Sequence, residues 1–202
     1  MLSKKKLPLS IGIILLIELC IFLWALSTTE PEFVLDKCAR NSGRASSALI
    51  LIILIGIGHY GLIKGYQDNK KKEIFQVLIL LFSINHFIHL FFVIINFNHH
   101  SLDLKISDNI HGFVTFIFLI IIPIIVWFRK SPTKIFYTII ILHLLNVTYF
   151  IIKTFESKIT PERPAYHNQF GILILCLAWL YIIFRIIVEV RQGLSRQAET
   201  QD

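Results

Sequence analysis

The stretch "IFQVLILLFSINHFIHLFFVIINF", from Ile74 to Phe97, contains no aspartate, glutamate, lysine or arginine. A helix rises about 1.5 Å per residue, so a run of this length can cross a hydrocarbon core about 30 Å thick. Its apolar residues form one continuous run rather than the periodic stripe of a surface helix. The stretch therefore predicts a membrane-spanning helix, and this sets the fold class of the chain.

The rest of the chain has the same character, with 55% hydrophobic and only 16% charged residues. Short connections between the apolar runs leave no room for a sizeable soluble domain. We therefore expect an all-α membrane protein, a six-transmembrane-helix bundle that forms a single transmembrane domain over residues 1–202. The predicted spans are approximately residues 7–26, 48–63, 74–97, 112–128, 135–152 and 170–190.

The basic residues indicate the orientation of these spans. With both termini in the cytoplasm, 13 of the 20 lysines and arginines lie at cytoplasmic span ends, which agrees with the positive-inside rule. The net charge of +7 then lies at a membrane surface, where we expect contacts with anionic lipid headgroups and not with nucleic acid. These residues are Lys4, Lys5, Lys6, Lys64, Lys70, Lys71, Lys72, Arg129, Lys130, Lys134, Arg185, Arg191 and Arg196.

Histidine is the residue type that points to chemistry. Four of the eight histidines fall in predicted outer loops or at span edges, where water satisfies them: His99, His100, His111 and His167. The other four lie within apolar runs, where an imidazole is costly unless a partner engages it: His59, His86, His89 and His143.

A pair of neutral imidazoles from two helices can bind the iron of a haem axially, and helical bundles host such cofactors. Measured from the preceding lysine, His143 lies about 13 Å into its span, His86 about 21 Å and His89 about 26 Å. This depth favours His86 over His89 as the partner of His143. His59 lies close to Lys64 and the membrane interface, so we expect it to make a local hydrogen bond.

Three motifs resemble the ferric reductase-like transmembrane domain family: "RNSGRASSALILI" in the second span, "NHFIHL" in the third and "RKSPTKIFYTIIILHLLNVTYF" entering the fifth. The family includes the haem subunit of the bacterial methionine sulfoxide reductase system. The resemblance implies haem b between histidines of the third and fifth helices, with Leu142-His143 as the fifth-helix motif. The pair His89-Leu90 matches the third-helix motif and favours His89, so both third-span histidines remain candidates.

The departures from the family limit what the resemblance implies. His143 is followed four turns later by Glu156 and Ser157 instead of a second histidine, so we expect one haem. The residues after Val190, "RQGLSRQAETQD", contain no glycine-rich phosphate loop. Electrons are therefore expected to come from a separate redox partner protein or from a quinone.

The predicted function is a b-type haem-binding membrane subunit, an electron-transfer component of an oxidoreductase system in a bacterial inner membrane. One alternative is a cytochrome b561-like electron carrier, which would also use His59 and His111. A second alternative is a haem-free multi-pass component, an assembly partner or small-solute carrier, whose histidines only form hydrogen bonds between helices.

Overall fold

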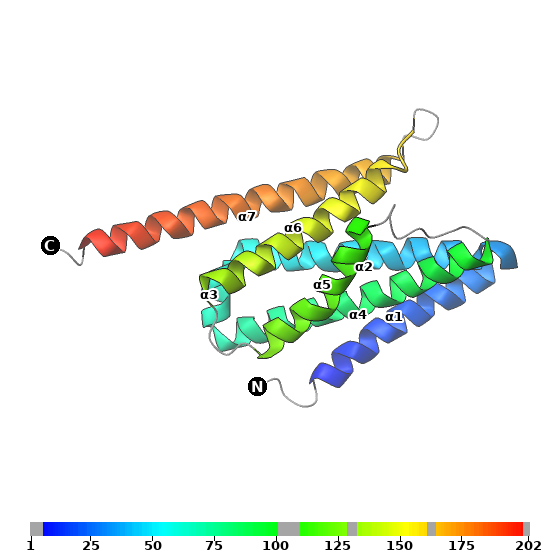
Figure 1. Ribbon diagram of the computed structural model, residues 1–202, viewed down its shortest axis with the longest axis horizontal. Helices are drawn as coiled ribbons and strands as arrows, with labels where there is room; N and C mark the ends of the chain where they lie inside the picture. Colours follow the sequence, from blue (N-terminus) through cyan, green and yellow to red (C-terminus); the bar gives the residue numbers. More distant parts are fainter. Residues whose placement is uncertain (1–5, 101–109, 129–132, 161–164, 200–202) are drawn as a thin grey trace. The chain divides into compact units, whose positions relative to one another are not determined.

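The computed structural model describes residues 6–100, 110–128, 133–160 and 165–199 of the chain. The described residues form helices and no strand, which confirms the all-α fold class. Figure 1 shows the helices in chain order: α1 (Lys6–Thr28), the 3-10 turn η1 (Pro31–Phe33), α2 (Val34–Tyr60), α3 (Leu62–Gln67), α4 (Asn69–His99), α5 (Ile110–Phe128), α6 (Lys134–Glu156) and α7 (Tyr166–Glu199).

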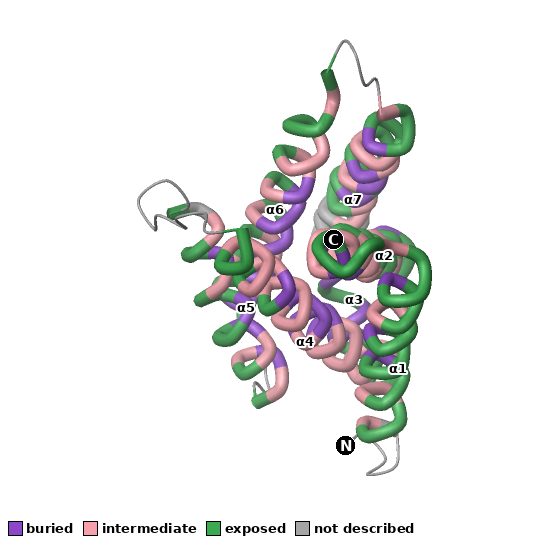
Figure 2. The backbone as a smooth tube through the Cα atoms, turned by 90° about the vertical axis from the view of Figure 1, so that its right-hand side faces the viewer, coloured by how far each residue is buried: buried purple, intermediate pink, exposed green. Residues whose placement is uncertain are grey.

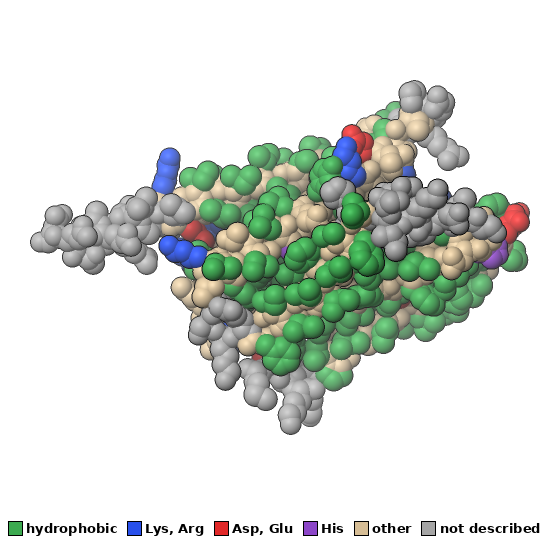
Figure 3. Space-filling model, viewed as in Figure 1, with side chains coloured by type: hydrophobic (Ala, Val, Ile, Leu, Met, Phe, Trp, Pro, Cys, Tyr) green, Lys and Arg blue, Asp and Glu red, His purple; other side chains and the backbone are tan. Residues whose placement is uncertain are grey.

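Five of the described segments are long and apolar enough to cross a membrane, and α5 contributes a shorter apolar helix over Gly112–Phe128. Large apolar side chains remain exposed along the long helices, as expected where lipid is the solvent. On the face shown in Figure 3, hydrophobic side chains cover the helices, and the visible charged groups lie near helix ends. The chain is an integral membrane protein, as predicted. The five long segments are Leu7–Thr28, Pro31–Tyr60, Asn69–His99, Lys134–Glu156 and Tyr166–Glu189.

The second span differs from its predicted bounds of 48–63, because α2 begins at Val34 and ends at Tyr60. Cys38, which precedes the predicted start of this span, is a fully buried residue of the helix. Polar residues in the first half of α2 interrupt the apolar run, and they lie on different faces of the helix. Ser42 and Ser46 are buried, whereas Arg40 points outward and pairs with Asp36 at 2.7 Å.

The helix ends at Tyr60 because Gly61 adopts φ +74, a left-handed conformation that continues no α-helix. The amide of Gly61 still donates to Ile57 O, at 2.8 Å. The short α3 begins at Leu62 and is followed by Asp68, whose Oδ1 accepts hydrogen bonds from the amides of Lys70 and Lys71. Asp68 thereby caps the first turn of α4.

The helices divide into two compact units. Unit 1 comprises Met1–Ile50 and Glu73–Ser131, and unit 2 comprises Leu51–Lys72 and Pro132–Asp202. The tube in Figure 2 shows buried positions recurring along one side of the individual helices. The single transmembrane domain stays a prediction, and so does the orientation of the spans. Four of the basic residues on which the predicted orientation depends lie outside the described part: Lys4, Lys5, Arg129 and Lys130.

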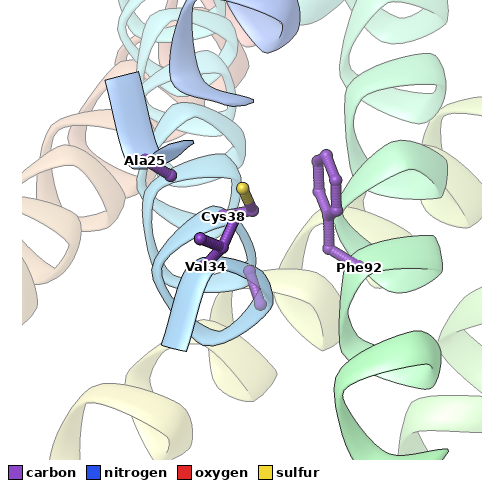
Figure 4. Packing of buried hydrophobic residues seen from close by; sticks show 5 residues of the cluster. Ala25, Val34, Cys38 and Phe92 are labelled. Atoms are coloured by element: carbon purple, nitrogen blue, oxygen red, sulfur yellow. The ribbon is translucent and has the colours of Figure 1, made fainter. Parts of the chain in front are cut away.

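Unit 1 contains α1, the first half of α2, most of α4, and α5. An apolar cluster joins the first three of these helices through Ala25, Val34, Cys38, Ala39 and Phe92 (Figure 4). The α4–α5 contact includes an edge-on pair, Phe87 and Phe116, with ring centroids 4.8 Å apart. Gln76 Nε2 donates to Val126 O at 2.9 Å, which satisfies one of the last carbonyls of α5.

Unit 2 contains the end of α2, α3, α6 and α7. Tyr66 of α3 is buried, with its ring edge-on to Phe136 of α6 at 5.2 Å. Burial raises the pKa of the Tyr66 phenol above its ordinary value. Close helix contacts occur at two glycines: Gly58 of α2 faces the ring of Tyr181 in α7, and Gly171 of α7 faces the ring of Phe155 in α6.

Candidate functional site: buried histidines and a polar cluster

The four histidines predicted within apolar runs differ in burial. His86 in α4 is 7% exposed and His143 in α6 is 5% exposed, so both side chains are buried. His89 is half-buried and His59 is exposed. In the described residues, His59 has an edge-on ring contact with Tyr60 at 4.7 Å, instead of the expected local hydrogen bond.

Three aromatic rings follow one another along α4 in unit 1. The centroid of His86 lies 5.5 Å from that of Phe82 and 5.3 Å from that of His89. At about 100° per residue, these three positions fall within about 60° of the helix circumference. His86 and His89 therefore lie on one face of α4, and Phe82 extends it.

His89 is held against α2 at Gly43. A Cβ built on Gly43 would lie 3.0 Å from Cε1 of His89 and 3.4 Å from its Nδ1. A side chain at position 43 would therefore press on the imidazole, and glycine leaves space for it.

His143 lies in unit 2, on the buried face of α6. It shares that face with Phe136, Ile140 and Val147, which recur at helical spacing and are all buried. An imidazole in this position is surrounded by apolar side chains of its own helix face. The histidines outside the spans match their prediction where they are described: His99, His100 and His167 are exposed, and the side chain of His111 lies outside the described part.

A second group of polar residues is buried in unit 1, where α1, α2 and α4 meet. Ser42 Oγ donates to Glu18 Oε1 at 2.8 Å, and Asn85 Nδ2 donates to the same oxygen. Ser46 Oγ donates to Asn85 Oδ1 at 3.2 Å. We call these four residues the polar cluster.

The sequence predicts only part of this cluster. An isolated carboxyl at Glu18 indicates contact with polar atoms of other helices, and the structure confirms this contact. The sequence does not predict which residues are the partners of Glu18. On α2, the spacing of Cys38, Ser42 and Ser46 is a signal, because small residues four apart allow helices to approach closely in a membrane. No comparable spacing marks Asn85.

The donor set limits which metal centres the chain could hold. Among the described residues, no group of three or more His, Cys, Asp or Glu side chains is arranged to bind a metal ion. A haem requires only axial imidazoles, because the porphyrin supplies the other ligands. The buried imidazoles of His86 and His143 fit this requirement chemically.

Comparisons with protein-family models, with curated proteins and with solved structures give no significant match to this chain.

Proposed function

We propose that the chain is a b-type haem-binding membrane subunit of the ferric reductase-like kind. It relays electrons across a membrane, to or from a partner protein or a quinone, and a bacterial inner membrane is its expected location. The observation that supports this most directly is the burial of two imidazoles, His86 and His143, in two different membrane-spanning helices. An ionisable side chain inside a membrane span points to function by default.

The proposed axial ligands are His143 of α6 and His86 of α4, with His89 as the alternative to His86. Each ligand would use the lone pair of a neutral ring nitrogen, and burial among apolar side chains favours the neutral form of histidine. Bound haem would supply a one-electron carrier whose potential depends on its axial ligands and on burial. The pairing of helices comes from the sequence pattern, and the experiment below tests it.

The protein would contribute three things through residues that the structure describes. Phe82 lies against the His86 ring and restricts its rotation. Gly43 leaves room for the His89 ring beside it. Ile140 and Val147, both buried on the face of His143, keep water away from that imidazole. Exclusion of water lowers the local dielectric constant, and this environment tunes the potential of a bound redox group.

Four single alanine variants test this assignment: His86→Ala, His89→Ala, His143→Ala and, as a matched control, His59→Ala. Each would be expressed with ample haem and purified, and its reduced-minus-oxidised absorption spectrum recorded. We expect the reduced α-band to be lost in His86→Ala and His143→Ala, and to persist in His89→Ala and His59→Ala. Wild-type protein without a Soret band would contradict the proposal itself. If, of the two third-span variants, only His89→Ala lost the α-band, His89 would replace His86 as the proposed ligand.

The alternative of a haem-free membrane component is favoured by a different observation. The polar cluster joins three helices by direct hydrogen bonds without any cofactor, as interhelical polar contacts in membranes commonly do. Under this alternative, none of the four histidine variants would change the spectrum, and purified protein would carry no haem. The cytochrome b561-like alternative requires His59 as a ligand, and the exposed position of that ring makes it the weaker candidate.

A further inference from the structure

Glu18 of unit 1 carries an acidic side chain that is buried inside a membrane-spanning helix bundle. Glu18 is 4% exposed, and its three partners in the polar cluster are 0% (Ser42), 1% (Ser46) and 1% (Asn85) exposed. The four residues come from three helices, α1, α2 and α4, within one compact unit. The cluster is therefore a buried, hydrogen-bonded site inside the membrane-spanning region.

Two of the three hydrogen bonds of the cluster point toward one atom. The hydroxyl of Ser42 and the amide NH2 of Asn85 both donate to Oε1 of Glu18, and Ser46 donates to the carbonyl oxygen of Asn85. The second carboxyl oxygen, Oε2, is buried and accepts no hydrogen bond from any described residue. Only one side of the carboxyl group is thus satisfied by the protein.

Apolar layers separate this carboxyl group from both ends of the unit. Toward one end, the apolar cluster of Ala25, Cys38 and Phe92 closes the three helices, and Ala25 lies about 10 Å along α1 from Glu18 (Figure 4). Toward the other end, Ile14 and Ile50 are buried one turn from Glu18 and Ser46, respectively. A carboxylate in such surroundings needs a cation at its unsatisfied oxygen.

We propose that Glu18 is a proton-binding site in the membrane interior, with Oε2 as the atom that takes up and releases the proton. Uptake forms an O–H bond at Oε2 and converts the carboxylate into the neutral acid, and release returns the proton to the aqueous phase. Two opposing effects make both states accessible: burial favours the neutral acid, and the two hydrogen bonds to Oε1 favour the carboxylate.

The geometry fits a proton better than a metal ion. A hard metal cation is held by several oxygen lone pairs that converge on it. Here Ser42 and Asn85 direct hydrogen atoms toward Oε1, and Oε2 offers one oxygen with no further protein ligand described beside it. One oxygen is sufficient for a proton and is insufficient for sodium or magnesium.

Other titratable groups lie near Glu18 on the helices packed against it. Cys38 of α2 precedes Ser42 by one turn and is buried. On α4, His86 and His89 follow Asn85. These groups remain in a Glu18→Gln variant, so a comparison with that variant isolates the titration of Glu18. Glutamine at this position preserves the acceptor at Oε1 and has the shape of the protonated acid.

The test is an infrared pH titration of the purified full chain, which follows the carbonyl stretch that only protonated carboxyl groups show. This measurement requires no haem, so it is independent of the proposed function. We expect a band that grows as the pH falls from about 9 to about 5 and that Glu18→Gln lacks. The proposal is overturned if the wild-type and Glu18→Gln titrations coincide, if the band persists unchanged at every pH, or if its midpoint follows the sodium concentration.

A second variant tests the role assigned to Ser42. Ser42→Ala removes one of the two donors to Oε1, so proton affinity should rise about tenfold and the midpoint should move up by about one pH unit. Ser83→Ala is the matched control, because Ser83 is a buried serine of α4 whose hydroxyl donates to Ile79 O in its own helix. An unchanged midpoint in Ser42→Ala, or an equal shift in Ser83→Ala, would overturn the proposal.

Discussion

Gly58→Ala tests the helix packing of unit 2, because Gly58 is the point where α2 meets the ring of Tyr181 in α7. A Cβ at this position would lie 2.4 Å from Cδ1 and 2.6 Å from Cε1 of Tyr181. Ordinary carbon contacts are about 3.5–4.0 Å, so the ring would have to move by about 1 Å. Overpacking of this kind costs roughly 1–3 kcal/mol, whereas alanine in place of glycine stabilises a helix by about 0.5–1 kcal/mol.

The expected net effect is a destabilisation of about 1–2 kcal/mol, which corresponds to a fall in thermal midpoint of about 2–8 °C for a chain of this size. The assay is the fraction of detergent-solubilised protein that stays monodisperse after heating. Gly12→Ala is the matched control, because nothing lies within 4 Å of a Cβ at Gly12. We expect its midpoint to stay the same or to rise.

A double-mutant cycle separates the clash from other effects of the substitution. In a Tyr181→Ala background the ring is absent, so Gly58→Ala should no longer destabilise the protein. The reasoning is refuted if Gly58→Ala is as stable as Gly12→Ala in the wild-type background, or if its destabilisation persists after Tyr181 is removed.

Three further predictions follow from single residues. Gly61→Ala should lower stability by about 1–3 kcal/mol, because φ +74 with ψ 145 is a backbone conformation that essentially only glycine adopts and because a Cβ there would collide with the Glu189 carboxyl group; a thermal midpoint equal to that of the wild type would contradict the assigned turn. Asp68→Ala should lower the thermal midpoint at neutral pH. The pKa of Asp68 is lowered, chiefly by the hydrogen bond from the backbone of Lys71, so this loss should disappear as the pH falls below the ordinary value for aspartate and through the lowered one. Gly43→Ala should displace the His89 ring by a few tenths of an ångström and leave the α-band of bound haem in place; loss of that band would make His89 the ligand.

The helices themselves could be predicted from the sequence, because length and apolarity alone decide whether a segment can cross a membrane. The exception is the first half of α2. An apolar-run criterion excludes the segment that holds Ser42 and Ser46, yet these serines are buried against polar groups of α1 and α4. A search for apolar runs therefore fails to detect a membrane-spanning helix whose polar residues face other helices of the protein.

The candidate site could be predicted only in part, because burial depends on which face of a helix meets its neighbours. His59 and His143 both lie in apolar runs, but one is exposed and the other is buried. The polar cluster joins residues that are 24 and 67 positions apart in the chain, and no local pattern connects them. The contact of Gly43 with His89 is equally long-range and required the fold.

The central claim is that buried imidazoles of membrane-spanning helices hold haem. Its most direct test is the haem content per chain of purified wild-type protein and of His143→Ala, measured as the pyridine haemochrome after expression with ample haem. The account predicts about one haem b per wild-type chain and almost none in the variant. Wild-type protein without haem, or equal haem content in both proteins, would contradict it.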